Sequence, residues 1–157
     1  MNVRHAIVLL VASFAAGCGS GSTIGQLPVA PPSAITVAAP TGTITGDAVA
    51  TMIEDTSDCP PAYGIGLRAS TGGADVTVVF PRWPDEGAVY DVSVPGMSDF
   101  VNVSARAVGH RYCVAESGAT GTVVVNRFEE VAGRWLVDVT LSGVTAGATT
   151  IDAHLYH

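Results

Sequence analysis

The chain contains no lysine, and only 13% of its 157 residues are charged. The charge that is present is one-sided, with seven basic residues, all arginine, against 14 acidic residues. The resulting net charge of −7 disfavours nucleic acids and anionic membrane surfaces as partners, because both carry dense negative charge. We therefore expect no nucleic-acid partner.

The chain also lacks an apolar run long enough to cross a bilayer. Its longest largely apolar segment, from Ala6 to Ala16, is far shorter than the about 20 residues that a transmembrane helix needs. Arg4 and His5 precede this segment and the small residue Gly17 follows it. A basic start, a short apolar run and small residues are the three parts of an export signal, which we place at residues 1–17.

The segment Ala15-Ala16-Gly17-Cys18 resembles the lipobox of bacterial lipoproteins. The resemblance implies that Cys18 is lipidated and becomes the mature N-terminus, so that acyl chains anchor the protein to a membrane of the cell envelope. The residue after Cys18 is Gly19 and not the acidic residue that serves as a retention signal in some lipoproteins, which favours anchoring in the outer membrane. The lipobox prefers leucine where this chain has Ala15, and ordinary secretion with simple cleavage is the alternative.

Glycine, serine and proline dominate the residues after Cys18, with Gly19 to Ser22 followed by four prolines up to Pro40. Glycine and serine form flexible coil, and proline extends it. We therefore predict a tether at residues 18–40 and a single domain at residues 41–157, which is long enough to bury a core. An irregular first strand around residues 35–38 is the alternative for the end of the tether.

Cysteine is scarce, and beyond Cys18 only Cys59 and Cys113 are present. Two cysteines in an exported domain most simply pair, because the compartment is oxidising. No Cys-x-x-Cys motif indicates a redox site. We therefore predict a structural disulfide between Cys59 and Cys113.

No segment keeps a helical apolar period for three turns, whereas short runs that alternate between apolar and polar residues recur along the chain. Trp135, Val137, Val139 and Leu141 share one face of such a run, and we assign Trp135 to the core. The pattern predicts an all-β fold, a single antiparallel β-sandwich or half-open barrel of about 8–9 strands. The expected strands are residues 42–53, 63–69, 75–80, 88–94, 100–108, 111–115, 122–127, 134–141 and 149–156.

Residues 121–141 form a predicted hairpin with a Gly-Thr-Val start, a polar turn and an alternating second strand led by Trp135. This pattern resembles the C-terminal part of many small β-rich bacterial lipoproteins of uncharacterised function. The resemblance implies a meandering β-sandwich and carries no implication about activity.

Catalytic signatures are missing. The chain has no Gly-x-Ser-x-Gly elbow and no glycine-rich phosphate loop. The mature chain has three histidines, His110, His154 and His157. Their spacing does not predict a shared site, because His154 and His157 are three residues apart and would face opposite sides of a strand. We therefore predict a protein that is not an enzyme and that uses no metal and no cofactor.

One loop stands out, the segment from Phe80 to Gly87, in which Pro81 and Pro84 oppose regular strand pairing. Its Trp83 either closes one end of the sandwich, which we favour, or stacks on a sugar ring or a partner protein together with Arg82 and Asp85. Two functions follow. The first is a lipid-anchored, non-catalytic domain of the cell envelope, structural or interacting with another envelope protein. The second is a module that binds carbohydrate or another ligand through this loop.

Overall fold

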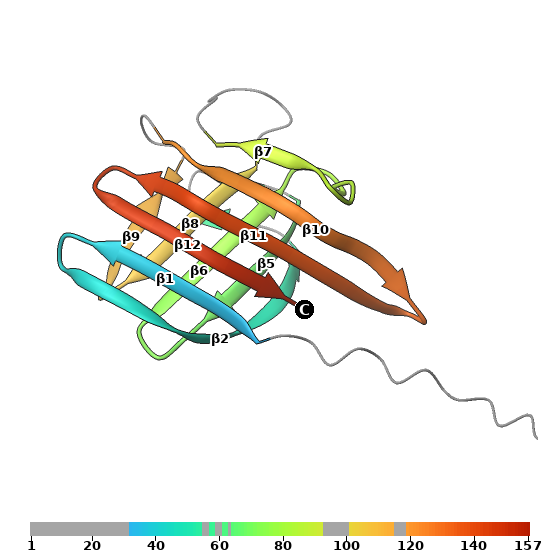
Figure 1. Cartoon of the computed structure of the whole chain (residues 1–157), viewed down its shortest axis with the longest axis horizontal. Coiled ribbons are helices and arrows are strands. Elements are labelled where there is room, and N and C mark those ends of the chain that lie inside the picture. Colours follow the sequence, from blue (N-terminus) through green and yellow to red (C-terminus); the bar gives the residue numbers. More distant parts are fainter. Residues whose placement is uncertain (1–31, 55–56, 59–60, 63, 93–100, 115–118) are drawn as a thin grey trace, which may run out of the picture.

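The computed structural model describes residues 32–54, 57–58, 61–62, 64–92, 101–114 and 119–157. The structure is all-β. Ten strands form one curled antiparallel sheet that makes a half-barrel (Figure 1). The predicted fold class, a single antiparallel sandwich or half-open barrel, is confirmed.

The strands of the large sheet follow the order β7-β10-β11-β12-β1-β2-β5-β6-β8-β9. A separate pair is formed by β3 (Ser57–Asp58) and β4 (Pro61–Ala62). The bounds of the strands in the large sheet are β1 (Ser33–Ala39), β2 (Gly42–Glu54), β5 (Ile65–Ser70), β6 (Ala74–Phe80), β7 (Val89–Asp91), β8 (Asn102–Ala107), β9 (His110–Cys113), β10 (Thr122–Val131), β11 (Arg134–Ala146) and β12 (Thr149–Tyr156).

The long strand β2 joins the two layers of the half-barrel. Residues 42–48 of β2 pair with β1, whereas residues 49–54 pair with β5. In Figure 1 the layer containing β10, β11, β12 and β1 therefore crosses in front of the layer containing β5, β6 and β8. Side chains of the two layers meet between them and form the core.

On β11 and β12 the core is filled by alternate residues, as the sequence pattern predicted for β11. Val137, Val139 and Leu141 of β11 are buried. On β12 the buried residues are Thr149, Ile151, Ala153 and Leu155, each two positions from the next. Burying a valine, leucine or isoleucine side chain contributes about 1.5–3 kcal/mol, so these two rows contribute substantially to stability.

The end of the predicted tether belongs to the folded domain. Residues 33–39 form β1, which pairs with β12 on one side and β2 on the other, and its Ile35 and Val37 are buried. The boundary at residue 40 was therefore wrong, and the alternative of a first strand around residues 35–38 holds. Alanine and proline obscured a strand whose alternation is short, with Ile35 and Val37 as its only large apolar residues. Residues 18–31 lie outside the described part of the chain.

Two strands extend further than predicted because irregularities let them continue. The register of the β10–β11 pair shifts between Val125 and Arg127, after which pairing continues to Val131. The register of the β11–β12 pair shifts between Leu141 and Val144, where Gly143 has a φ of 57°. Such bulges bend a strand without ending it.

Two short turns place residues other than glycine in the left-handed region. Val108 (φ 50°) precedes Gly109 between β8 and β9, and Ala132 (φ 52°) precedes Gly133 between β10 and β11. Two-residue hairpin turns of this kind favour Asn-Gly, because asparagine tolerates a positive φ better than valine or alanine does.

Candidate functional site

The loop between β6 and β7 holds the three residues that the sequence singled out for ligand binding. Arg82, Trp83 and Asp85 are all exposed, whereas Pro84 between them is buried. Trp83 retains 56% of its accessible surface. Our preference for Trp83 as a buried end plug was therefore wrong, because the indole lies on the surface of the half-barrel.

Trp83 is held by other aromatic rings. Its ring centroid lies 4.6 Å from that of Trp135, with an interplanar angle of 29°, and 5.5 Å from that of Phe128, edge to face. Phe128 in turn lies 5.5 Å from Trp135 and 6.4 Å from the fully buried Phe80. We call Trp83, Phe128 and Trp135 the aromatic surface. Stacked and edge-to-face pairs of this kind each stabilise by about 0.5–1.5 kcal/mol beyond burial.

Trp135 does not belong to the fully buried core, contrary to the prediction. It is half-buried and packs against the core from its edge. The alternation of β11 placed it correctly on the inward face, but β11 projects beyond the opposite layer at this end (Figure 1). The ring of Trp83 stacks on Trp135 at this end of the sheet.

A hollow of about 320 Å³ lies beside Trp83. Its lining consists of Gly64, Ile65, Pro81, Arg82 and Trp83. A volume of this order is at the lower end of the range found for small-ligand sites. Two of the three predicted ligand-binding residues, Arg82 and Trp83, thus lie together at the hollow, whereas Asp85 does not line it.

Asp85 has a backbone role in shaping the loop. Its carbonyl oxygen accepts a hydrogen bond from the Ala88 amide (3.1 Å), which closes a turn. The Gly87 amide donates to the Val125 carbonyl (2.7 Å), and the Val125 amide donates to the Ala88 carbonyl (2.9 Å). These bonds fix the end of the loop to β10, so that Trp83 is presented by a supported segment.

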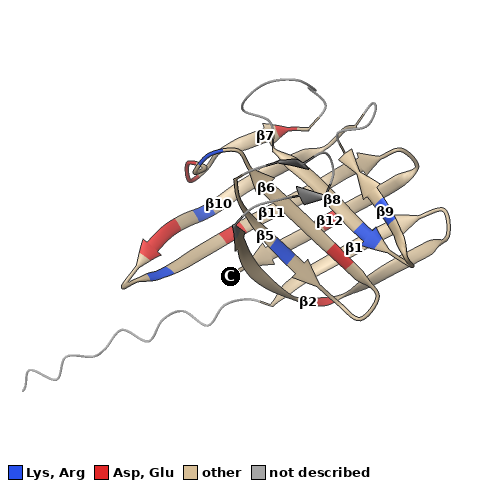
Figure 2. Cartoon of the chain, turned by 180° about the vertical axis from the view of Figure 1, so that it is seen from behind, with Lys and Arg blue, Asp and Glu red and all other residues tan. Residues whose placement is uncertain are grey.

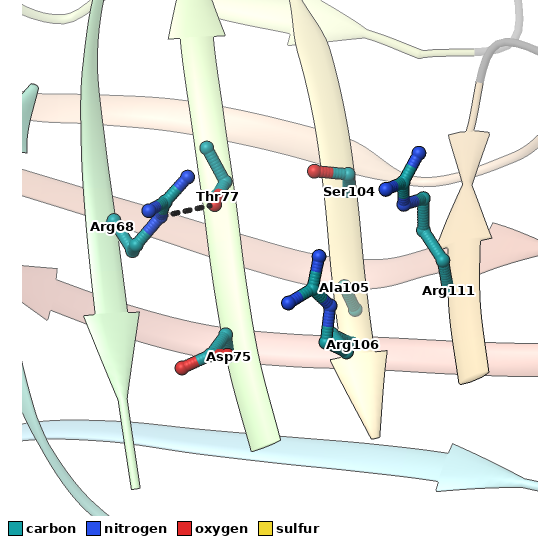
Figure 3. A pocket seen from close by; sticks show the side chains of 7 residues that line it. All are labelled: Arg68, Asp75, Thr77, Ser104, Ala105, Arg106 and Arg111. Atoms are coloured by element: carbon teal, nitrogen blue, oxygen red, sulfur yellow. Dashed lines mark hydrogen bonds between the residues drawn. The ribbon is translucent and has the colours of Figure 1, made fainter. Parts of the chain in front are cut away.

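A second hollow, which the sequence did not indicate, lies on the outer face of β5, β6, β8 and β9. It is a cleft of about 250 Å³, and we call it the arginine cleft (Figure 3). Its lining residues are Arg68, Asp75, Thr77, Ser104, Ala105, Arg106 and Arg111.

Strand register brings the residues of this cleft together. Arg68 pairs with Thr77, and Thr77 pairs with Ser104. In the neighbouring row, Asp75 pairs with Arg106, which pairs with Arg111. Because residues two apart on a strand share a face, the two rows lie side by side on the outer surface.

The floor of the arginine cleft is polar and nearly inaccessible. Thr77 is 6% exposed and Ser104 is 8% exposed. Arg68 donates a hydrogen bond from Nε to the Thr77 hydroxyl (3.4 Å). In Figure 3 the guanidinium groups of Arg68, Arg106 and Arg111 are directed toward the region of Thr77 and Ser104.

A histidine–carboxylate pair lies elsewhere, where β10, β11 and β12 run side by side. His154 Nε2 lies 2.9 Å from Asp138 Oδ1, and the Asn126 amide donates to the same oxygen (2.7 Å) and to the Thr140 hydroxyl (2.9 Å). Neither hollow is lined by these side chains. Their evident role is to connect three strands through side-chain hydrogen bonds.

The histidines and acidic residues of the described ranges do not gather into a metal centre: no group of three or more histidine, cysteine, aspartate or glutamate side chains there could hold a metal ion. Within the same ranges, no helix has the length and apolarity that crossing a membrane requires.

Cys113, at the end of β9, is disulfide-bonded. Its predicted partner, Cys59, lies outside the described residues, so the pairing of these two cysteines stays a prediction. The predicted lipidation residue, Cys18, and the export signal at residues 1–17 also lie outside the described part of the chain.

Comparison with known proteins found no matching family model, no similar curated protein and no similar solved structure.

Proposed function

We propose that this protein is a lipid-anchored, non-catalytic domain of the cell envelope that binds carbohydrate on its aromatic surface. The exposure of Trp83 carries the proposal. Tryptophan is enriched at interfaces, and a contiguous group of exposed apolar side chains is a mark of an interaction site.

The way in which Trp83 is held supports a binding role. Trp135 stacks on the indole, Phe128 contacts it edge to face, and the loop is hydrogen-bonded to β10. A ring fixed before the ligand arrives loses little conformational entropy on binding, which raises affinity. A planar aromatic ring suits the flat apolar face of a sugar, and Arg82 at the hollow adds donors for hydroxyl groups.

The lipid anchor rests on the sequence. The leader and Cys18 predict attachment to a membrane, and the mature chain would then begin with a tether that enters β1. The Ser33 hydroxyl at the start of β1 donates to the Tyr156 carbonyl (3.0 Å), and Tyr156 pairs with Asp138 of β11. The tether therefore meets the domain at the same end of the sheet as Trp135, which would bring the aromatic surface close to envelope glycans.

The proposal is tested with the full chain carrying Cys18→Ser, which removes the acceptor of the lipid and keeps the protein in solution. A panel of neutral hexose and N-acetylhexosamine oligosaccharides is titrated while tryptophan fluorescence is recorded. We expect saturable binding by the starting chain. Trp83→Ala should weaken binding at least about 30-fold, since a tryptophan at the centre of a binding surface contributes about 2 kcal/mol or more.

Val49→Ala is the matched control, because Val49 is a large apolar residue that is 74% exposed and belongs neither to the aromatic surface nor to the lining of the hollow beside Trp83. It should leave oligosaccharide affinity unchanged. Equal affinity in the starting chain and Trp83→Ala, or no binding by any oligosaccharide of the panel, would contradict the proposal.

A further inference from the structure

The arginine cleft has a charge opposite to that of the protein. Three of the chain's seven basic residues line it, whereas the chain as a whole carries a net charge of −7. Seen from behind, the layer of β5, β6, β8 and β9 carries these basic positions beside the acidic position on β6 (Figure 2). With three guanidinium groups and one carboxylate, the lining has a formal charge of +2.

The arrangement of the three arginines follows from the sheet. Arg106 and Arg111 lie directly opposite each other on β8 and β9, and Arg68 lies two strands from Ser104 in the adjacent row. Like charges placed directly opposite each other on antiparallel strands destabilise the pair. Arg106 also faces Asp75 on β6, so this row places one carboxylate and two guanidinium groups side by side, and a bound anion would contact both guanidinium groups.

The donors in the cleft match a tetrahedral oxyanion. Each guanidinium presents a planar fork of N–H groups, which suits phosphate and carboxylate oxygens in a bidentate manner. The Thr77 and Ser104 hydroxyls, at the floor, add short donors that water hardly reaches. Three cations around one position favour a dianion over a monoanion, because the attraction scales with the ligand charge.

We propose that the arginine cleft binds a small soluble anion through a phosphate group. This site is separate from the aromatic surface, and the proposal does not rest on carbohydrate binding. The volume of about 250 Å³ admits a phosphate with a small organic body. An anionic bilayer is the other source of phosphate groups, but the net charge of −7 opposes its approach.

Inorganic phosphate serves as the probe, titrated by calorimetry at pH 7.5 and low ionic strength into the full chain carrying Cys18→Ser. We expect saturable binding. Arg68→Gln and Arg106→Gln should each weaken it about 10-fold or more, since hydrogen bonds to charged groups are among the strong ones. Asp75→Asn should tighten binding several-fold, because it removes the one negative charge of the lining.

Arg134→Gln is the charge-matched control. Arg134 is exposed at the start of β11, outside the cleft, and its loss changes the net charge by the same amount. Phosphate affinity should stay within about 2-fold in this variant, since distant surface charges contribute little. Binding should also weaken as the solution is made mildly acidic from pH 7.5, because inorganic phosphate then loses its second charge while arginine stays ionised.

The opposite effects of Asp75→Asn and the arginine variants keep the test decisive even if one variant fails to fold. Absence of saturable phosphate binding would overturn the proposal, and so would an equal loss of affinity in Arg134→Gln. Vesicles of phosphatidylglycerol in phosphatidylcholine form the second arm. Binding to these vesicles without binding of free phosphate would overturn the assignment to a soluble anion.

Discussion

The aromatic surface and the arginine cleft occupy different parts of one sheet and are built in different ways. Trp83 lies on a loop and packs against two rings of the β10–β11 hairpin, so its position depends on a few local contacts. The three arginines come from three strands, and only the pairing register places them together. A site on one loop can be predicted from a short stretch of sequence, whereas a site on a sheet face can be recognised only once the strand order is known.

The two regions also differ chemically. On β10, which carries Phe128 of the aromatic surface, Arg127 is hydrogen-bonded and ion-paired to Glu129, which raises the pKa of Arg127. The arginine cleft is lined by three cationic side chains and one carboxylate. Neutral ligands suit the first region and anions suit the second, so variants of one region should leave the other intact.

Gly64→Ala should give the largest effect, because it disturbs the segment beside the Trp83 loop and leaves the arginine cleft intact. A Cβ at Gly64 would lie 1.9 Å from the Phe80 carbonyl oxygen and 3.2 Å from the Pro81 Cα, both of them backbone atoms. The segment that leads into the Trp83 loop must therefore shift. We expect a loss of about 1–3 kcal/mol in the free energy of unfolding, typical of overpacking, measured by urea denaturation.

The same variant should lose oligosaccharide affinity and keep phosphate affinity. Gly72→Ala is its control, since a Cβ there meets nothing within 4 Å and its φ lies outside the left-handed region. If the Gly64→Ala protein were as stable as the starting chain, Gly64 would not lie as close to the Phe80 carbonyl as described. Equal loss of both affinities would show that the two regions are coupled.

A smaller effect is expected at the two hairpin turns, one in each region. Val108→Asn alters the turn beside β9 of the arginine cleft, and Ala132→Asn alters the turn between β10 and β11. Each should stabilise the fold by up to about 1 kcal/mol, because asparagine relieves the cost of a positive φ. The urea midpoint is the measure, and a decrease for either variant would contradict the assigned turn conformation.

The sequence predicted the strands well because alternation survives wherever one face is buried. The β11 row from Val137 to Leu141 was placed correctly. Strand β1 was assigned to the tether, since a few small residues around Ile35 and Val37 carry too weak a pattern beside so many prolines.

The site was predicted in part. Pro81 and Pro84 located Trp83 in a loop, but its exposure depends on how far β11 projects beside Trp135, which no local pattern gives. Arg68, Arg106 and Arg111 were missed, because on separate strands they resemble ordinary outward-facing charges. A weak signal existed for Arg106, which is the last polar residue of the alternating sequence Asn-Val-Ser-Ala-Arg-Ala in β8.

The central claim is that one fold carries two separate binding regions of different chemistry. Amide and side-chain N–H spectra of the isotope-labelled full chain with Cys18→Ser test it most directly, recorded with a neutral oligosaccharide that binds and then with inorganic phosphate. We predict that the oligosaccharide shifts the indole signals of Trp83 and Trp135, whereas phosphate shifts the Nε–H signals of Arg68, Arg106 and Arg111. Shifts of one common set of residues by both ligands, or phosphate shifts centred on residues outside the cleft, would contradict the account.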